Sequence, residues 1–194
     1  MTNKPWLNTS GVVYSNSSVG IGTSSPSEKL DVVGNIEVSG EYKYSTTKTD
    51  YYHVGCSEFI ARNGDVGCWC LHGNQEYGCF GGISGTWRAF ATIHLPQGAI
   101  VTEVRIYYVD CSTNNMTVYF RRTGSGGISI ENLGSISSTE TDSPSAPIAR
   151  SMYFNPNVTI DNASNRYTII FESAQNDNNH RLYNVRIQYT INQL

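Results

Sequence analysis

The feature that most limits how this chain can fold is an alternation of apolar and polar side chains with a period of two. The last run shows it most clearly, because apolar and polar residues alternate strictly over residues 184–191. Similar runs cover residues 88–95, 100–108, 117–120 and 167–171. This period is typical of half-buried antiparallel strands, and turn residues separate the runs. The pattern predicts an all-β fold with an antiparallel, jelly-roll-like β-sandwich.

Three local expectations follow from this pattern. Ile100 should share one face of its strand with Val104, Ile106 and Tyr108, because these residues fall on one side of the run. Residues 124–145 should contain the longest polar loop. Trp87 directly precedes a strand, and we expect it in the core of the sandwich rather than at the surface.

The composition of the chain argues against several classes of function. Ser, Thr and Asn make up 57 of the 194 residues and charged residues only 15%, compared with about 25% in a typical globular domain. The net charge of −3 and the lack of a basic run argue against a nucleic-acid partner. No apolar stretch approaches the ~18 residues of a membrane span, so we expect no membrane insertion. The first residues lack the apolar core of a signal peptide, so either the protein is not exported by that route or its leader has been lost, and we expect it to fold in the bacterial cytoplasm.

Residues 1–45 differ from the rest of the chain, because their apolar residues come in short bursts separated by Gly, Ser and Asn. Strands this short cannot build a two-sided core within one chain. Copies of the segment wound around a threefold axis would supply the missing surface, with Gly20 and Gly22 allowing close backbone approach. The apolar residues that need such cover are Val13, Ile21, Leu30, Val32 and Ile36. We therefore expect a short intertwined β-shaft over residues 1–45 and a head domain over residues 46–194.

Part of this segment carries a family resemblance. Residues 19–36 read VGIGTSSPSEKLDVVGNI, which resembles the GIGT-x-x-P-x-x-K-L-D-V-x-G-N-I element of phage tail fibres and related trimeric β-fibres. The resemblance implies a homotrimeric shaft with a distal domain attached. It also implies a place in a virion or extracellular particle, with other fibre or baseplate proteins bound through the N-terminal segment.

A second resemblance concerns the head. Residues 94–110, which begin HLPQGAIVTEV, are similar to the LP-x-GA-x-(I/V)-T strand pair of bacterial extracellular β-sandwich modules. Residues 159–167, TIDNASNRY, are similar to the V-D-N-x-x-N-x-Y turn and strand of the same modules. Such modules are generally non-catalytic, so the resemblance implies a fold rather than an activity.

The five cysteines allow three interpretations. Cys56, Cys68, Cys70 and Cys79 have His53 and His72 nearby, which could suggest zinc. The Cys-x-Cys spacing is not that of a zinc knuckle, and it lies near the upper limit for an easy disulfide. With Cys111 the count is odd, which favours reduced thiols. We therefore expect no metal and no cofactor.

No pattern of residues in the chain marks a catalytic site. Acidic residues such as Glu58, Asp65 and Glu76 show no spacing typical of a glycosidase pair, and no Gly-x-Ser-x-Gly turn is present. We therefore expect a protein that is not an enzyme and has no catalytic residue.

Exposed aromatic residues give a stronger indication, since sugars stack on aromatic rings while amides and acids bind their hydroxyls. Trp69 and Tyr77 lie in the least regular segment, beside Asn74 and Glu76, and either ring could instead fill the end of the core. The loop at residues 175–180 connects two well-patterned strands, so we expect a hairpin tip that offers Asn178 and His180 to a ligand or serves as a plain polar turn. The candidate ligand-binding residues are Trp69, Asn74, Glu76, Tyr77, Asn178 and His180.

These observations favour a distal fibre protein of a phage or phage-like particle. Its head would attach to a host-surface glycan or protein by multivalent, non-covalent binding. One alternative is a structural virion fibre or decoration protein without a receptor. A second is a glycan-depolymerising spike, although such spikes usually need a far longer chain to form a substrate cleft.

Overall fold

The computed structural model describes residues 17–61, 86–139, 147–174 and 179–193. The contacts of the chain divide it into two compact units, Met1–Tyr42 and Lys43–Leu194. This division comes after Tyr42, and the shaft over residues 1–45 stays a prediction.

The first unit contains a pair of very short parallel strands. Strand β1 (Val19–Ile21) pairs with β2 (Leu30–Val32), and Val33 donates a backbone hydrogen bond to Ile21. A side chain at Gly20 would place its Cβ 2.4 Å from the carbonyl oxygen of Thr23, and Gly22 has a φ of +77°. The crowding that requires these glycines therefore lies within the chain itself.

Apolar side chains of this unit remain open to solvent. Ile21 is 53% exposed, Leu30 58% and Ile36 56%, while Val32 is half-buried. Val13 lies outside the described residues. The described part of this unit, residues 17–42, therefore forms no core of its own.

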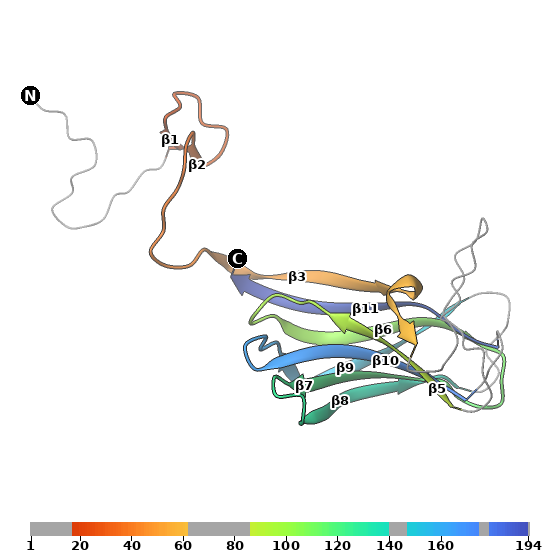
Figure 1. Cartoon of the computed structure of the whole chain (residues 1–194). Helices are drawn as coiled ribbons and strands as arrows, with labels where there is room; N and C mark the ends of the chain where they lie inside the picture. Colours follow the sequence, from red (N-terminus) through yellow and green to blue (C-terminus); the bar gives the residue numbers. More distant parts are fainter. Residues whose placement is uncertain (1–16, 62–85, 140–146, 175–178, 194) are drawn as a thin grey trace, which may run out of the picture. The chain divides into compact units, whose positions relative to one another are not determined.

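The second unit is an antiparallel β-sandwich made of two sheets (Figure 1). The four-stranded sheet contains, in spatial order, β3 (Lys43–Gly55), β11 (His180–Gln193), β6 (Ile100–Asp110) and β9 (Ile148–Thr159). The five-stranded sheet contains β4 (Ile60–Ala61), β5 (Trp87–Ile93), β10 (Asn165–Ser173), β7 (Thr117–Gly124) and β8 (Ile130–Ser137). One turn of 3-10 helix, η1 (Cys56–Glu58), separates β3 from β4, and the described residues contain no α-helix. The predicted all-β sandwich is confirmed.

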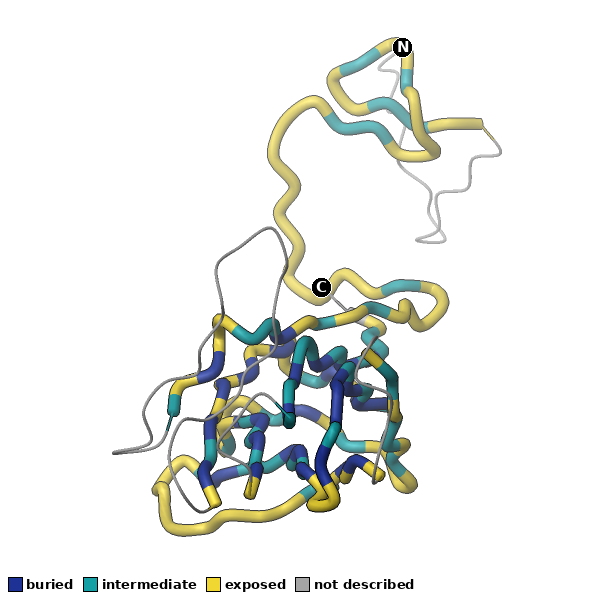
Figure 2. The backbone as a smooth tube through the Cα atoms, turned by 90° about the vertical axis from the view of Figure 1, so that its right-hand side faces the viewer, coloured by how far each residue is buried: buried dark blue, intermediate teal, exposed yellow. Residues whose placement is uncertain are grey.

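The core lies between the two sheets and is built from alternate residues of nearly every strand. Buried and less buried positions follow one another along the strands in Figure 2, as the period-two pattern requires. Trp87 is only 1% exposed and packs edge-on against Phe171, with 5.0 Å between the ring centroids. Its predicted place in the core is confirmed.

One local prediction was wrong, and one strand was missed. Ile100 is 36% exposed and Val101 is fully buried, because a bulge between Val101 and Glu103 shifts which residues face inward. Strand β8 lies within residues 124–145, the range in which the sequence predicts the longest polar loop, and only Ile136 of this strand is buried. Since β8 is an edge strand, most of its side chains face solvent, and the alternation that marks a half-buried strand is lost. None of the described helical segments is long and apolar enough to cross a membrane.

Candidate functional site

The outer face of the five-stranded sheet carries a hollow of about 540 Å³. The residues that line it come from four strands that are adjacent in the sheet but scattered in sequence. These residues are Arg88, Phe90, Thr92, Arg121, Thr123, Ile130, Arg166, Thr168 and Ile170. Each occupies an outward position, because the alternate residues of the same strands point into the core.

Strand register arranges these side chains in rows across the sheet. One row is apolar, since Ile60 is the register partner of Phe90, Phe90 of Ile170, and Ile170 of Tyr119. We call these four residues the apolar row. Phe90 is 38% exposed and Ile60 is 63% exposed, so the row offers a ring and aliphatic surface to solvent. Such a row can hold the apolar face of a flat ligand.

A polar row lies on each side of the apolar row. On one side, Arg88 and Glu172 are register partners and form an ion pair, and Glu172 also accepts a hydrogen bond of 3.3 Å from the hydroxyl of Tyr119. On the other side, Thr92 pairs with Thr168 and Thr168 with Arg121. An ion pair therefore borders one edge of the apolar row, and hydroxyl and guanidinium donors border the other edge, where they could bind the hydroxyls of a sugar ring.

Arg121 is held by stacking rather than by an acid. Its guanidinium carbon lies 4.6 Å from the centroid of the Tyr119 ring. Its Nε atom is buried without a hydrogen-bond partner among the described residues. Arg166 is exposed and forms no ion pair with any described residue.

The outer face of the four-stranded sheet is organised around one carboxylate, that of Glu103. Glu103 is only 5% exposed and accepts hydrogen bonds from the Ser151 hydroxyl and, at 3.0 Å, from Arg186. Burial alone would raise the pKa of Glu103. The two hydrogen bonds and the charges of Arg186 and Arg105 outweigh burial, so that the pKa lies below its usual value. The Arg186 guanidinium also lies 5.0 Å from the centre of the Tyr51 ring.

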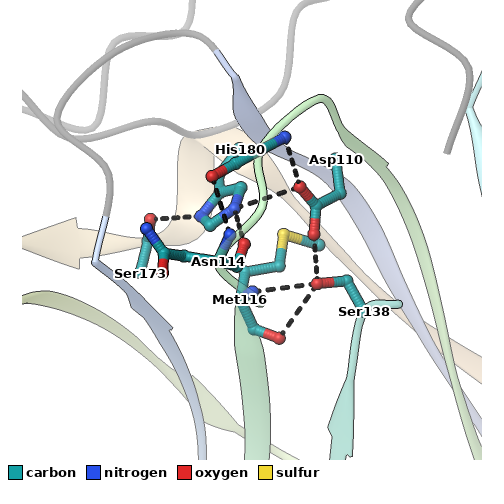
Figure 3. Close-up of polar contacts among 7 residues, drawn as sticks. Asp110, Asn114, Met116, Ser138, Ser173 and His180 are labelled. Carbon is teal, nitrogen blue, oxygen red and sulfur yellow. Dashed lines mark hydrogen bonds and ion pairs between the residues drawn. The ribbon is translucent and has the colours of Figure 1, made fainter. Parts of the chain in front are cut away.

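A buried polar cluster closes one end of the sandwich (Figure 3). His180 is fully buried, and its Nε2 atom lies 2.6 Å from the carbonyl oxygen of Asn114 and 3.1 Å from Asp110. Both partners are acceptors, so Nε2 carries a hydrogen. The Nδ1 atom lies 2.7 Å from the hydroxyl of Ser173. Asp110 in turn accepts hydrogen bonds from the Ser112 amide, at 2.9 Å, and from the Ser138 hydroxyl.

This cluster contains the three residue types of a hydrolytic triad but lacks their usual arrangement. In a triad the imidazole bonds serine through Nε2 and the acid through Nδ1, which is the reverse of what His180 does. Ser173 is 1% exposed and Asp110 is fully buried, so no substrate can reach the hydroxyl. The cluster satisfies buried polar groups and thereby fixes the starts and ends of several strands.

The structure places only one of the predicted ligand-binding residues. Trp69, Asn74, Glu76 and Tyr77 lie outside the described residues, as does Asn178, and their roles stay predictions. His180 is described, and its buried ring is not offered to a ligand at the surface. The segment before it is also not the tip of a hairpin, because β10 and β11 belong to different sheets. The chain therefore crosses from one layer to the other at this point.

The described cysteines, Cys56 and Cys111, are thiols that form no disulfide. Cys68, Cys70 and Cys79 lie outside the described residues. Within the ranges that the structure describes, no three His, Cys, Asp or Glu side chains come together as metal ligands would.

The hollow was missed by the sequence analysis, although part of its signal was present. Alternation identifies Arg88, Phe90 and Thr92 as the outward residues of their run. It does not reveal that β10 and β7 lie next to β5, which is what brings Ile170 and Arg121 beside them.

No protein-family model matches the sequence, and no curated protein matches it. Several solved structures share a low level of similarity with the chain. The CBM36-1 domain of a multidomain xylanase from the hindgut metagenome of Trinervitermes trinervoides is 15% identical, over 71% of this chain and 96% of that one, with a TM-score of 0.39. A family 35 carbohydrate-binding module from Clostridium thermocellum is 9% identical, over 74% of this chain and 98% of that one, with a TM-score of 0.39.

A phage protein is among the similar structures. The enzymatically active domain of tailspike protein 4 from bacteriophage CBA120 is 10% identical and gives a TM-score of 0.34. The similarity covers 75% of this chain but only 19% of the tailspike chain. The hollow and its rows, described above, rest on the residues of this chain alone.

Proposed function

We propose that the head binds a glycan non-covalently in the hollow on the outer face of the five-stranded sheet. The observation that carries this proposal is the apolar row, with Phe90 and Ile170 in the hollow and polar groups on both sides. A pyranose ring has an apolar face and a rim of hydroxyls, so it can lie on the row while Thr and Arg side chains bind the hydroxyls.

Binding rather than hydrolysis is the activity that this hollow supports. Glycoside hydrolysis uses two carboxyl groups on either side of the scissile bond. The described residues that line the hollow include no carboxylate, and the neighbouring Glu172 is engaged by Arg88 and Tyr119. A glycan in the hollow would therefore be held and not cleaved.

The same proposal includes assembly into a homotrimeric fibre of a phage or phage-like particle, in which the head attaches to a host-surface glycan. Support comes from the first unit, where Ile21, Leu30 and Ile36 are exposed in a single chain. Two further copies around a threefold axis would cover these side chains. Three heads on one fibre would raise a weak affinity for a glycan by orders of magnitude. The N-terminal segment would join other fibre or baseplate proteins of the virion.

The glycan proposal is tested by binding of the labelled full chain to a glycan array that contains neutral and acidic oligosaccharides. Phe90→Ala should weaken binding at least tenfold, because the ring supplies the stacking surface. Tyr153→Ala is the matched control, since Tyr153 is 74% exposed on the other sheet. Absence of binding to every glycan, or an equal loss in both variants, would contradict the proposal.

The assembly proposal is tested by the molecular mass in solution. The full chain should be a trimer, and Ile21→Asp should dissociate it by placing three carboxylates near one axis. Ser24→Asp adds the same charge at an exposed polar position of the same segment and should leave the trimer intact. A full chain that is monomeric at micromolar concentration would overturn the assembly proposal but not the glycan proposal.

A structural fibre protein without a receptor is the second candidate. The exposed apolar residues of the first unit favour it as much as they favour an attachment fibre. Such a protein would form the same trimer but would bind neither host cells nor any glycan of the array.

A further inference from the structure

The hollow has a concentration of positive charge. Of the residues that line it, three are arginines and none is acidic, whereas the whole chain has a net charge of −3. Arg88 is neutralised by Glu172 on one side of the apolar row. Arg121 and Arg166 lie on the other side and form no ion pair with any described residue.

Arg121 and Arg166 are close enough to act together. Arg121 is the register partner of Thr168, which lies two residues from Arg166 on the same face of β10. Diagonal neighbours of this kind have their Cα atoms about 7–8 Å apart, within reach of long side chains. Two adjacent cations repel each other, and an anion between them removes this repulsion.

Arg121 is also positioned before any ligand arrives. Glu172, fixed by Arg88, accepts the hydroxyl hydrogen bond of Tyr119, and the Tyr119 ring lies under the Arg121 guanidinium. Stacking uses the face of a guanidinium and leaves its in-plane N–H groups for an anion. The Nε atom of Arg121 is covered, so the terminal N–H groups of the guanidinium are the ones that a ligand in the hollow could reach. A donor that is ordered in advance binds an anion at a lower entropic cost.

The spacing of the rows fits a sugar that carries its own carboxylate. The row of Arg121 lies about 6.8 Å from the apolar row, because successive outward residues are two positions apart along a strand. This distance is comparable with the length of one uronic acid, whose carboxylate is attached directly to the pyranose ring. The ring would lie on Phe90 and Ile170 while the planar carboxylate receives paired hydrogen bonds from an arginine fork.

We propose that the ligand of the hollow is an acidic glycan made of uronic acids, whose carboxylate binds Arg121 and Arg166. This inference rests on the proposed function, and it names the class of sugar that the hollow selects.

The test measures binding of the full chain to oligomers of galacturonic, glucuronic and mannuronic acid. Each oligomer is compared with its methyl ester, which keeps the ring and removes the charge. At least one acid should bind ten times more tightly than its ester, and raising the salt concentration should reduce the difference. Arg121→Gln and Arg166→Gln should each weaken binding of the acid about tenfold or more, and weaken binding of the ester by a much smaller factor, because the ester loses only a hydrogen bond to a hydroxyl. Lys48→Gln removes the same charge from β3 in the other sheet and should have no effect.

The outcomes separate this inference from the proposed function. If acid and ester bind equally, or if only neutral oligomers bind, the hollow is a glycan site and the uronic acid inference is wrong. If only phosphorylated or sulfated oligosaccharides bind in a parallel arm, an anion is recognised but the assignment to carboxylate is wrong. If no oligosaccharide of any kind binds, the proposed function itself fails. A loss caused by unfolding is recognised because the arginine variants would then lose as much affinity for the ester as for the acid.

Discussion

On the outer face of the four-stranded sheet, Glu103 lies between the charges of Arg186 and Arg105, whereas the outer face of the five-stranded sheet has its carboxylate on one side only. Both faces carry arginines stacked near tyrosines, Arg186 near Tyr51 in the first and Arg121 near Tyr119 in the second. The difference is the position of the acid. On the four-stranded face, the central Glu103 interacts with the arginines on that face. On the five-stranded face, Glu172 pairs with Arg88 on one side of the apolar row, so Arg121 and Arg166 on the other side remain available to a ligand.

The largest expected change in stability comes from removing Glu103, the central acid of the four-stranded face. Glu103→Ala should lower the free energy of unfolding by about 3 kcal/mol, because Arg186 would be left partly buried without its partner. Urea denaturation measures this change. Glu172→Ala is the matched variant, and since Arg88 is well exposed to solvent we expect a loss of only about 1 kcal/mol. Equal losses would show that the two carboxylates do not differ in the way described.

The pH dependence of stability should be determined in part by Glu103 on the four-stranded face. The pKa of Glu103 is lowered in the folded protein, so its contribution to stability is complete above its ordinary pKa of about 4.5 and is lost as the pH falls through the lowered value. Thermal unfolding at pH 7 and at about pH 3 should show a smaller acid-induced loss in Glu103→Gln than in the wild type. An identical loss in both proteins would contradict the assignment.

The smallest expected effect comes from changing Tyr119, whose ring stacks with the Arg121 guanidinium. Tyr119→Phe keeps the ring and removes only the hydroxyl bonded to Glu172, so the free energy of unfolding should fall by less than about 1 kcal/mol. Affinity for an acidic oligosaccharide should fall only a few-fold, because the guanidinium keeps its stacking surface. Tyr107→Phe, on the other face, serves as the control in the same titration. A larger loss in the control would place the binding surface on the four-stranded sheet.

The central strands could be predicted from sequence because both of their faces leave a signal. Val185 and Ile187 point into the core while Arg186 between them points out, and the same alternation marks β5 and β10. Edge strands lose this signal, as β8 shows with its single buried Ile136. A bulge also defeats the pattern, which is why Val101 rather than Ile100 is buried.

The candidate site was harder to predict than the fold, because it depends on strand order. Phe90, Ile170 and Tyr119 become neighbours only when β5, β10 and β7 are placed side by side. His180 shows the opposite difficulty, since a polar residue next to a polar loop looks exposed in sequence and is fully buried in the structure. Its burial depends on Asp110 and Ser173, which satisfy its ring nitrogens from two other strands.

The buried cluster around His180 has a consequence for how the protein can diversify. The connection between β10 and β11 is anchored on both sides, by Ser173 and His180 in the cluster and by the amide of Cys111, which bonds the carbonyl oxygen of Asn179 at 2.8 Å. These anchors join the end of β10 in one sheet to the start of β11 and the end of β6 in the other. A substitution in the cluster therefore disturbs strands of both sheets at once, so selection has little freedom to change Asp110, Ser173 or His180.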